Sequence, residues 1–234
     1  METCGKKSAE TECVVQSHFT LEGLKLNVGC GSTAADGWTN IDRSLNIYLS
    51  RLPHIKHLLY KLGVISQAAY ENEWKGRYLR RNIERGLPFK NDTAACIYSS
   101  HLLEHLSRNK AVSFLEECFR VLRPKGIVRI AVPDLRVHAM RYVRKSDPEG
   151  SEYDDRAGDE FLEGLIYLKE YPWMQRIFGK GNQHLWMYDF SSLTRILKDI
   201  GFTDIGLKSF RIGSVPDLDR LETREDSLFV EASK

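Results

Sequence analysis

Short apolar runs alternate with longer amphipathic stretches along most of the chain, beginning at Leu24. Apolar runs bounded by glycine, proline or polar residues predict strands. Such runs occur at 24–28, 38–41, 95–98, 127–132, 202–210 and 227–231. Apolar residues spaced three and four apart predict a helix from Ala111 to Leu122, which the Arg123–Gly126 stretch should end. This alternation is typical of a doubly wound, mostly parallel α/β sheet, in which ligands bind at the carboxyl ends of the strands.

Two further helices carry capping signals. Asp189 precedes a helical pattern that includes Leu193 and ends at Gly201, so Asp189 is its expected N-cap. Asp134 precedes a second helical pattern at 136–143. Asp134 therefore either caps this helix or faces a substrate at the end of the strand.

Two stretches interrupt the alternation. Residues 43–80 contain a helical pattern around 52–62, and residues 135–188 form a long insertion rich in aromatic residues. Insertions at the ligand edge of such a sheet commonly act as lids. We therefore expect a flexible N-terminal segment at 1–17 and one domain at 18–234 that contains both insertions.

The composition agrees with a soluble globular domain, since 42% of the residues are hydrophobic and 28% are charged. A formal net charge of +2 does not indicate a nucleic-acid partner or a membrane surface. We find neither the apolar core of a signal peptide nor a run long enough to span a bilayer. The five cysteines form no Cys-x-x-Cys pair and are interpreted as reduced thiols, with Cys96 and Cys118 buried. These features predict a cytoplasmic protein.

A glycine turn follows the first candidate strand. Glycine at positions 29 and 31 allows a sharp turn and close approach of a ligand, although a tight turn without a ligand has the same pattern. Asp42, at the end of the second strand, could accept hydrogen bonds from ribose hydroxyls. Ten residues separate Gly31 from Asp42, and Ala34 stands where a third glycine is expected. A crossover helix does not fit that spacing, so a ligand without a pyrophosphate is favoured over NAD or FAD.

Five motifs follow one another along the chain. They are Leu26-Asn27-Val28-Gly29-Cys30-Gly31, Gly37-Trp38-Thr39-Asn40-Ile41-Asp42, Leu87-Pro88-Phe89, Ser99-Ser100-His101-Leu102-Leu103-Glu104-His105-Leu106 and Val121-Leu122-Arg123-Pro124-Lys125-Gly126. Together they resemble the class I S-adenosylmethionine-dependent methyltransferases of the type 11 group. The subgroup with a short Gly-to-Asp connection is frequently found with bacterial surface-polysaccharide genes. The similarity covers 24–134 and resumes at 184–210.

The resemblance implies a Rossmann-like, mostly parallel seven-stranded sheet with a helical insertion, and S-adenosylmethionine as the cofactor. It implies cofactor contacts for Asn27, Gly29, Cys30, Gly31, Asp42, Asn82, Ile83, Ser99 and Ser100. The glycine turn would border the methionine part, and Asp42 would hold the ribose. Asn82 stands where the subgroup usually has aspartate toward the adenine amino group, and it lacks the charge.

The segment His101-x-x-Glu104-His105 has the spacing of one helical face and matches the pattern of inverted zinc peptidases. A zinc hydrolase is therefore an alternative. Such an enzyme needs a third protein ligand, and the sequence does not indicate one. We predict no metal, with His101 near the cofactor as a catalytic residue and His105 either near it or purely structural.

His184 follows a glycine-rich stretch at the return of the second insertion. It is either a general base for an acceptor hydroxyl or a loop histidine that fixes local structure. We expect methyl transfer to a small molecule, most simply to an oxygen of a sugar or polysaccharide precursor. A non-catalytic sensor or scaffold that binds S-adenosylmethionine is the other alternative.

Two further groups of side chains can each be interpreted in two ways. The aromatic residues of the second insertion form either its own small core or part of a substrate pocket; they are Tyr153, Phe161, Tyr167, Tyr171, Trp173 and Phe178. The arginines at 77, 80, 81 and 85 form either a solvated face or a handle for an anionic substrate.

Overall fold

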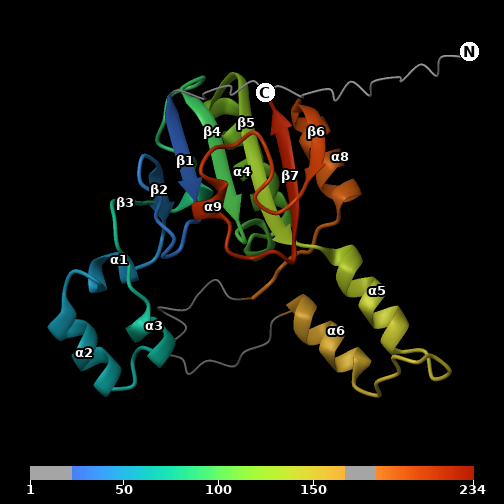
Figure 1. Cartoon of the computed structure of the whole chain (residues 1–234). Helices are drawn as coiled ribbons and strands as arrows, with labels where there is room; N and C mark the ends of the chain where they lie inside the picture. The colour runs from blue at the N-terminus through green and yellow to red at the C-terminus, as the bar shows by residue number, and fades with distance from the viewer. Residues whose placement is uncertain (1–22, 167–182) are drawn as a thin grey trace, which may run out of the picture.

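The computed structural model describes residues 23–166 and 183–234. Its centre is a seven-stranded sheet in the order β3-β2-β1-β4-β5-β7-β6 (Figure 1). The strands are β1 (Leu24–Val28), β2 (Thr39–Asp42), β3 (Tyr78–Arg80), β4 (Ala94–Ser100), β5 (Leu122–Pro133), β6 (Thr203–Lys208) and β7 (Ser227–Ser233). The strands from β3 to β5 pair in parallel, and β7 pairs antiparallel with both β5 and β6. The predicted mostly parallel sheet is confirmed.

The central strands are the most apolar ones. All of β4 except Ser100 is buried, because the sheet covers its two edges and other elements cover its two faces. The edge strand β3 is short, with exposed ends, and its sequence had not predicted a strand. The helix before β5 ends at Val121 as expected, but the next residues already belong to the strand, so β5 is longer than predicted.

Helices cover the two faces of the sheet unequally. On one face α4 (Arg108–Val121) and α8 (Phe190–Ile200) bury apolar side chains in the main core. Asp189 forms a capping box with Ser192 at the start of α8, and Gly201 ends the helix with a φ of +112°, as both residues predict. A smaller core on the other face contains Trp38, Tyr98 and residues of the short helix α9 (Leu218–Leu221).

Both insertions lie beyond the carboxyl ends of β1, β4 and β5 (Figure 1). The first contains α1 (Asn46–Leu49), α2 (Pro53–Lys61) and α3 (Gln67–Glu71), and the second contains α5 (Leu135–Lys145) and α6 (Ala157–Ile166). Asp134 accepts a hydrogen bond from the backbone N–H of Arg136 at 2.9 Å, so it is the N-cap of α5. No helix among the described residues has the length and apolar character needed to cross a membrane.

The second insertion starts and ends at one place. Asp134 and Tyr188 form a parallel bridge, and the N–H of Leu135 donates to the carbonyl of Tyr188 at 2.9 Å. Within the insertion, the rings of Tyr142 and Phe161 stack with centroids 4.9 Å apart, which joins α5 to α6. Four of the predicted aromatic residues, at 167, 171, 173 and 178, and the expected flexible segment at 1–17 lie outside the described residues.

Candidate functional site

A cavity of about 840 Å³ opens at the carboxyl ends of β1, β2 and β4. Among the residues that line it are Asn27, Gly29, Cys30, Gly31, Asp42, Asn82, Ile83, Ser100, His101 and His184, all predicted from the sequence. Ser99 is not in the lining and is wholly buried. Successive residues of a strand point to opposite faces, so the strand that presents Ser100 to the cavity turns Ser99 into the core.

The glycine turn needs both of its glycines. Gly29 has a φ of +72° and Gly31 a φ of +53°, which favour glycine over any other residue. A Cβ at position 29 would come within 2.9 Å of the Leu102 side chain, whereas a Cβ at position 31 would meet nothing within 4 Å. Position 31 therefore borders open space, where a ligand can approach the backbone closely.

Asp42 is tied to the glycine turn. Its carboxylate accepts hydrogen bonds from the N–H of Gly31 at 2.9 Å and from the N–H of Ser44 at 2.7 Å. A carboxylate has about four acceptor positions, so this leaves capacity for ligand hydroxyls. The stretch between the turn and β2 contains no helix, as the short spacing predicted.

The side chains of two buried asparagines hold the residues after the glycine turn in place by hydrogen bonds. The side-chain amide of Asn27 donates to the carbonyl of Thr33 at 2.9 Å and to Oδ1 of Asn40 at 3.0 Å. Asn40 in turn accepts from the N–H of Ala35 and donates to its carbonyl. Asn27 thus uses its side chain to brace the turn. The sequence analysis missed Asn40, although a polar residue on the buried face of a strand, two residues before Asp42, was a usable signal.

The wall beside Asp42 is formed by the residues after β3. Asn82 is the N-cap of the 3-10 helix η1 (Ile83–Arg85), where its Oδ1 accepts from the N–H of Glu84 at 3.1 Å. Ile83 is buried and contributes to the core. Opposite them, burial and the nearby Asp42 carboxylate raise the pKa of the Cys30 thiol, which therefore stays protonated.

The arginine run lies next to this wall. A second cavity of about 350 Å³ is lined by Arg43, Arg80, Arg81, Asn82 and Arg85. Arg81 and Asn82 also line the larger cavity. That these arginines bind an anionic part of a substrate stays a prediction. They lie beside the larger cavity.

His101 differs from its predicted place. It has a φ of +49° and follows β4, whereas the 3-10 helix η2 contains only Leu103–His105, so the predicted common helical face is wrong. The turn nevertheless brings Nδ1 of His101 to 3.0 Å from Oε1 of Glu104 and Nε2 to 3.0 Å from Oγ of Ser227. A carboxylate only accepts, so we assign the proton to Nδ1, which donates to Glu104. Nη1 of Arg224 also lies 3.3 Å from this nitrogen.

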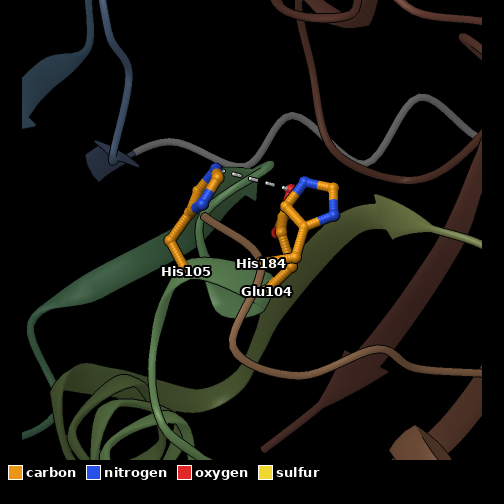
Figure 2. Close-up of side chains that lie close together, drawn as sticks. All are labelled: Glu104, His105 and His184. Carbon is orange, nitrogen blue, oxygen red and sulfur yellow. Dashed lines mark ion pairs between the residues drawn. The ribbon is translucent and has the colours of Figure 1, made fainter. Parts of the chain in front are cut away.

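Glu104, His105 and His184 converge on one point of the cavity wall (Figure 2). One potential ligand atom from each residue lies within 4.8 Å of the other two. Nδ1 of His105 is 3.0 Å from the carbonyl of Gln183, and Nε2 is 4.0 Å from Oε1 of Glu104. The sequence did not indicate His184 as a neighbour of this motif, whereas His101 is not part of the group; the prediction that no metal binds stays a prediction.

The segment around His184 is fixed against η2. The N–H groups of Leu185 and Trp186 both donate to the carbonyl of Glu104, at 2.6 and 3.3 Å. Arg108 also lies over the ring of Trp186, with 5.2 Å between the guanidinium carbon and the ring centroid. Burial lowers the pKa of His184, and the Glu104 carboxylate opposes this only in part. His184 is thus neutral at pH 7.

Comparison with known proteins identifies the domain. Residues 26–130 match the family described as "Methyltransferase domain". A solved S-adenosylmethionine-dependent methyltransferase from Methanosarcina mazei has the same fold, with a TM-score of 0.50, 16% identity, and coverage of 97% of this chain and 99% of that chain. Residues 26–130 thus resemble a methyltransferase domain, and the chain shares its fold with a solved S-adenosylmethionine-dependent methyltransferase. The predicted Rossmann-like fold class and the predicted cofactor, S-adenosylmethionine, are confirmed.

A relative in Saccharomyces cerevisiae, described as "Uncharacterized protein YBR225W", is 30% identical over 132 residues. The match covers 56% of this chain and 14% of the yeast protein. This chain therefore corresponds to a small part of that much longer protein.

Proposed function

We propose that the protein transfers a methyl group from S-adenosylmethionine to an oxygen of a small-molecule acceptor such as a sugar or a polysaccharide precursor. One observation carries this proposal: a single cavity has the glycine turn and Asp42 among its walls, together with the imidazoles of His101, His105 and His184. The first set suits a nucleoside with an amino-acid tail, and the second suits a group that loses a proton.

The residues present fit the cofactor. The open space at Gly31 admits a close approach to the backbone, and Asp42 retains acceptor capacity for ribose hydroxyls. Ile83 and Asn82 stand next along the wall, where an apolar face and an amide suit an adenine ring. When bound, S-adenosylmethionine supplies an already activated methyl group, so the chain itself has to bind, orient and exclude water.

The histidines favour an oxygen acceptor. A neutral amine already carries a nucleophilic lone pair, whereas a hydroxyl becomes a good nucleophile only when its proton is removed. We assign the catalytic contact to His184, because its ring is neutral and lines the cavity. Both ring nitrogens of His101 are already in hydrogen bonds, so its role is to position Glu104.

Calorimetry with S-adenosylhomocysteine tests the cofactor half of the proposal. Asp42→Ala should weaken binding by at least about tenfold, because a hydrogen bond to a charged group contributes about 1.5–3 kcal/mol. Asp36→Ala is the matched control, since Asp36 is exposed in the same connection and does not line the cavity. Equal affinity in the two variants would remove Asp42 from the cofactor site.

Single-turnover rates with a panel of sugars and nucleotide sugars test the acceptor half. His184→Ala should lower the rate by about 10²–10⁴-fold and leave the affinity for S-adenosylhomocysteine unchanged. Tight cofactor binding without transfer to any acceptor of a broad panel would instead support a sensor or scaffold. An unchanged rate in the variant would return His184 to a structural role.

A further inference from the structure

Glu104 has a buried carboxylate that its neighbours satisfy only in part. Its side chain is about 1% exposed, and Oε1 accepts the hydrogen bond from Nδ1 of His101 at 3.0 Å. Oε2 is also buried, yet within the described ranges 23–166 and 183–234 it has no hydrogen-bond partner. A buried carboxylate oxygen is costly without a donor or a cation, so a cation bound by Glu104 would offset this cost.

Each of the two imidazoles places one ring nitrogen near the same point. Nδ1 of His105 lies 3.0 Å from the Gln183 carbonyl, which only accepts, so in the neutral ring that nitrogen carries the proton and Nε2 has the lone pair. This Nε2 lies 4.0 Å from Oε1 of Glu104, and the ring of His184 lies 5.2 Å from that of His105, between centroids (Figure 2). An imidazole lone pair and a carboxylate that face each other repel unless a cation lies between them.

The surrounding hydrogen bonds hold these ligand atoms in place. Metal-binding histidines typically donate their second N–H to a carbonyl or carboxylate, and metal-binding carboxylates are themselves hydrogen-bonded. His105 makes the first kind of bond with Gln183, and Glu104 receives the second from His101. The hydrogen bonds from Leu185 and Trp186 to the Glu104 carbonyl fix the backbone next to His184. The arrangement is thus built around the convergence point.

We propose that Glu104, His105 and His184 bind one divalent transition-metal ion of the zinc and cobalt class. Two imidazoles and one carboxylate suit such ions better than magnesium or calcium, which prefer oxygen ligands. Three protein ligands leave at least one coordination position, as in catalytic metal sites. All three residues line the cavity, so this position is open to a ligand there.

The ligand of the open position would be an acceptor hydroxyl, and this part rests on the proposed function. A bound divalent ion lowers the pKa of a coordinated hydroxyl, whose proton then passes to water. The oxygen forms its bond to the methyl carbon as the carbon–sulfur bond breaks and S-adenosylhomocysteine is released. His184 then acts on the acceptor through the ion, because its lone pair is used for the metal.

Titration of the chelator-treated full chain with Co²⁺ alone tests the site, with visible absorption and calorimetry as readouts. We expect one Co²⁺ per chain with ligand-field bands of a site containing imidazole nitrogen. His184→Ala and the nearly isosteric Glu104→Gln should each weaken binding by more than about tenfold. His57→Ala is the control, because His57 is an exposed imidazole on α2 and should leave both the stoichiometry and the affinity unchanged.

The absence of stoichiometric Co²⁺ binding by the wild-type chain would overturn the metal site. Equal Co²⁺ affinity in the wild type and the Glu104→Gln and His184→Ala variants would overturn it as well, since the ion would then bind elsewhere. Binding of S-adenosylhomocysteine to the same samples separates the two proposals. If the chain binds S-adenosylhomocysteine but not Co²⁺, the proposed function stands and the metal site is wrong. If it binds Co²⁺ but not S-adenosylhomocysteine, the metal site stands and the proposed function is wrong.

Discussion

Among the residues that the structure describes, two groups of charged side chains are buried, and they differ in how completely their polar atoms are paired. One surrounds Arg129 on β5, whose guanidinium donates to Glu222 at 2.5 and 3.1 Å and to Glu231 at 3.1 Å. The carbonyls of Ser209 and Ile212 accept further hydrogen bonds from it. This cluster connects β5 and β7 to the segment between β6 and β7, and its guanidinium has no unused capacity.

The other group surrounds Glu104 and is just as buried. Its carboxylate faces imidazoles in place of a guanidinium, and Oε2 has no partner in the described part of the chain. Burial is thus the same for Glu104 and Arg129, whereas the balance of donors and acceptors is not. Unused hydrogen-bonding capacity, more than burial, thus distinguishes the Glu104 group from the Arg129 cluster.

The largest loss of stability is expected when the cation of the Arg129 cluster is removed. Arg129→Met would leave the carboxylates of Glu222 and Glu231 buried without their cation, and breaking such a group costs about 3–5 kcal/mol of unfolding free energy. Urea unfolding followed by circular dichroism measures this. Arg120→Met, which breaks a partly exposed pair with Glu117, should cost much less. Equal losses in the two variants would contradict the structural role of the buried cluster.

Removing one carboxylate charge from each group compares them directly. Glu222→Gln should lower the free energy of unfolding by about 3 kcal/mol, because the Arg129 charge loses a bidentate partner. Glu104→Gln should change it by less than about 1 kcal/mol in the metal-free protein, because the lost carboxylate was only partly paired. Urea midpoints of the two variants measured side by side decide this. A larger loss for Glu104→Gln would mean that its group is also a closed structural unit.

A bound cation should remove the difference between the two groups. Co²⁺ at about one hundred times its dissociation constant should raise the free energy of unfolding by about 2.7 kcal/mol in the wild-type chain. Glu104→Gln should show little of this gain at the same concentration. Thermal unfolding with and without chelator measures both. Stabilisation of equal size in the variant would show that Glu104 does not hold the ion.

The smallest effect concerns a histidine outside both groups. Burial, aided by Arg141, lowers the pKa of His138 on α5 below its ordinary value. The folded state therefore binds this proton less readily than the unfolded state, so the contribution is complete above about pH 6.5 and is lost as the pH falls toward the folded pKa. His138→Gln should lose less stability than the wild type between pH 7 and pH 5. Identical pH profiles would show that this histidine does not titrate differently on folding.

The sheet and the cavity wall formed by the glycine turn and Asp42 were largely predictable from the sequence. Apolar runs define the central strands because these strands are buried on both faces. Gly31 could be recognised because the turn requires a positive φ, and Asp42 because a carboxylate at the end of a strand is a typical hydrogen-bond acceptor for ribose. The edge strand β3 was missed since a short, exposed strand has no apolar pattern. Ser99 was misplaced because the sequence does not tell which of two adjacent strand residues faces the cavity.

The acceptor side was less predictable. His101, Glu104 and His105 were noted as a motif, but the left-handed backbone at His101 broke the assumed helical face. His184 joins this group through tertiary contacts with the Glu104 carbonyl and the neighbouring ring, and no local pattern encodes such contacts. The buried Arg129 cluster was missed for the same reason, because Glu222 and Glu231 come from other elements.

The bridge between Asp134 and Tyr188 makes the second insertion modular. Its two ends are hydrogen-bonded neighbours, so the segment leaves the sheet and returns to it at the same point, whatever its length. The entropic cost of closing a loop rises only slowly with the number of residues, so segments of different size can be exchanged here at little cost to the fold. His184 lies just before this bridge, near the end of the insertion. A change in the length of the segment between Asp134 and His184 should therefore leave the strand order and the glycine turn unchanged.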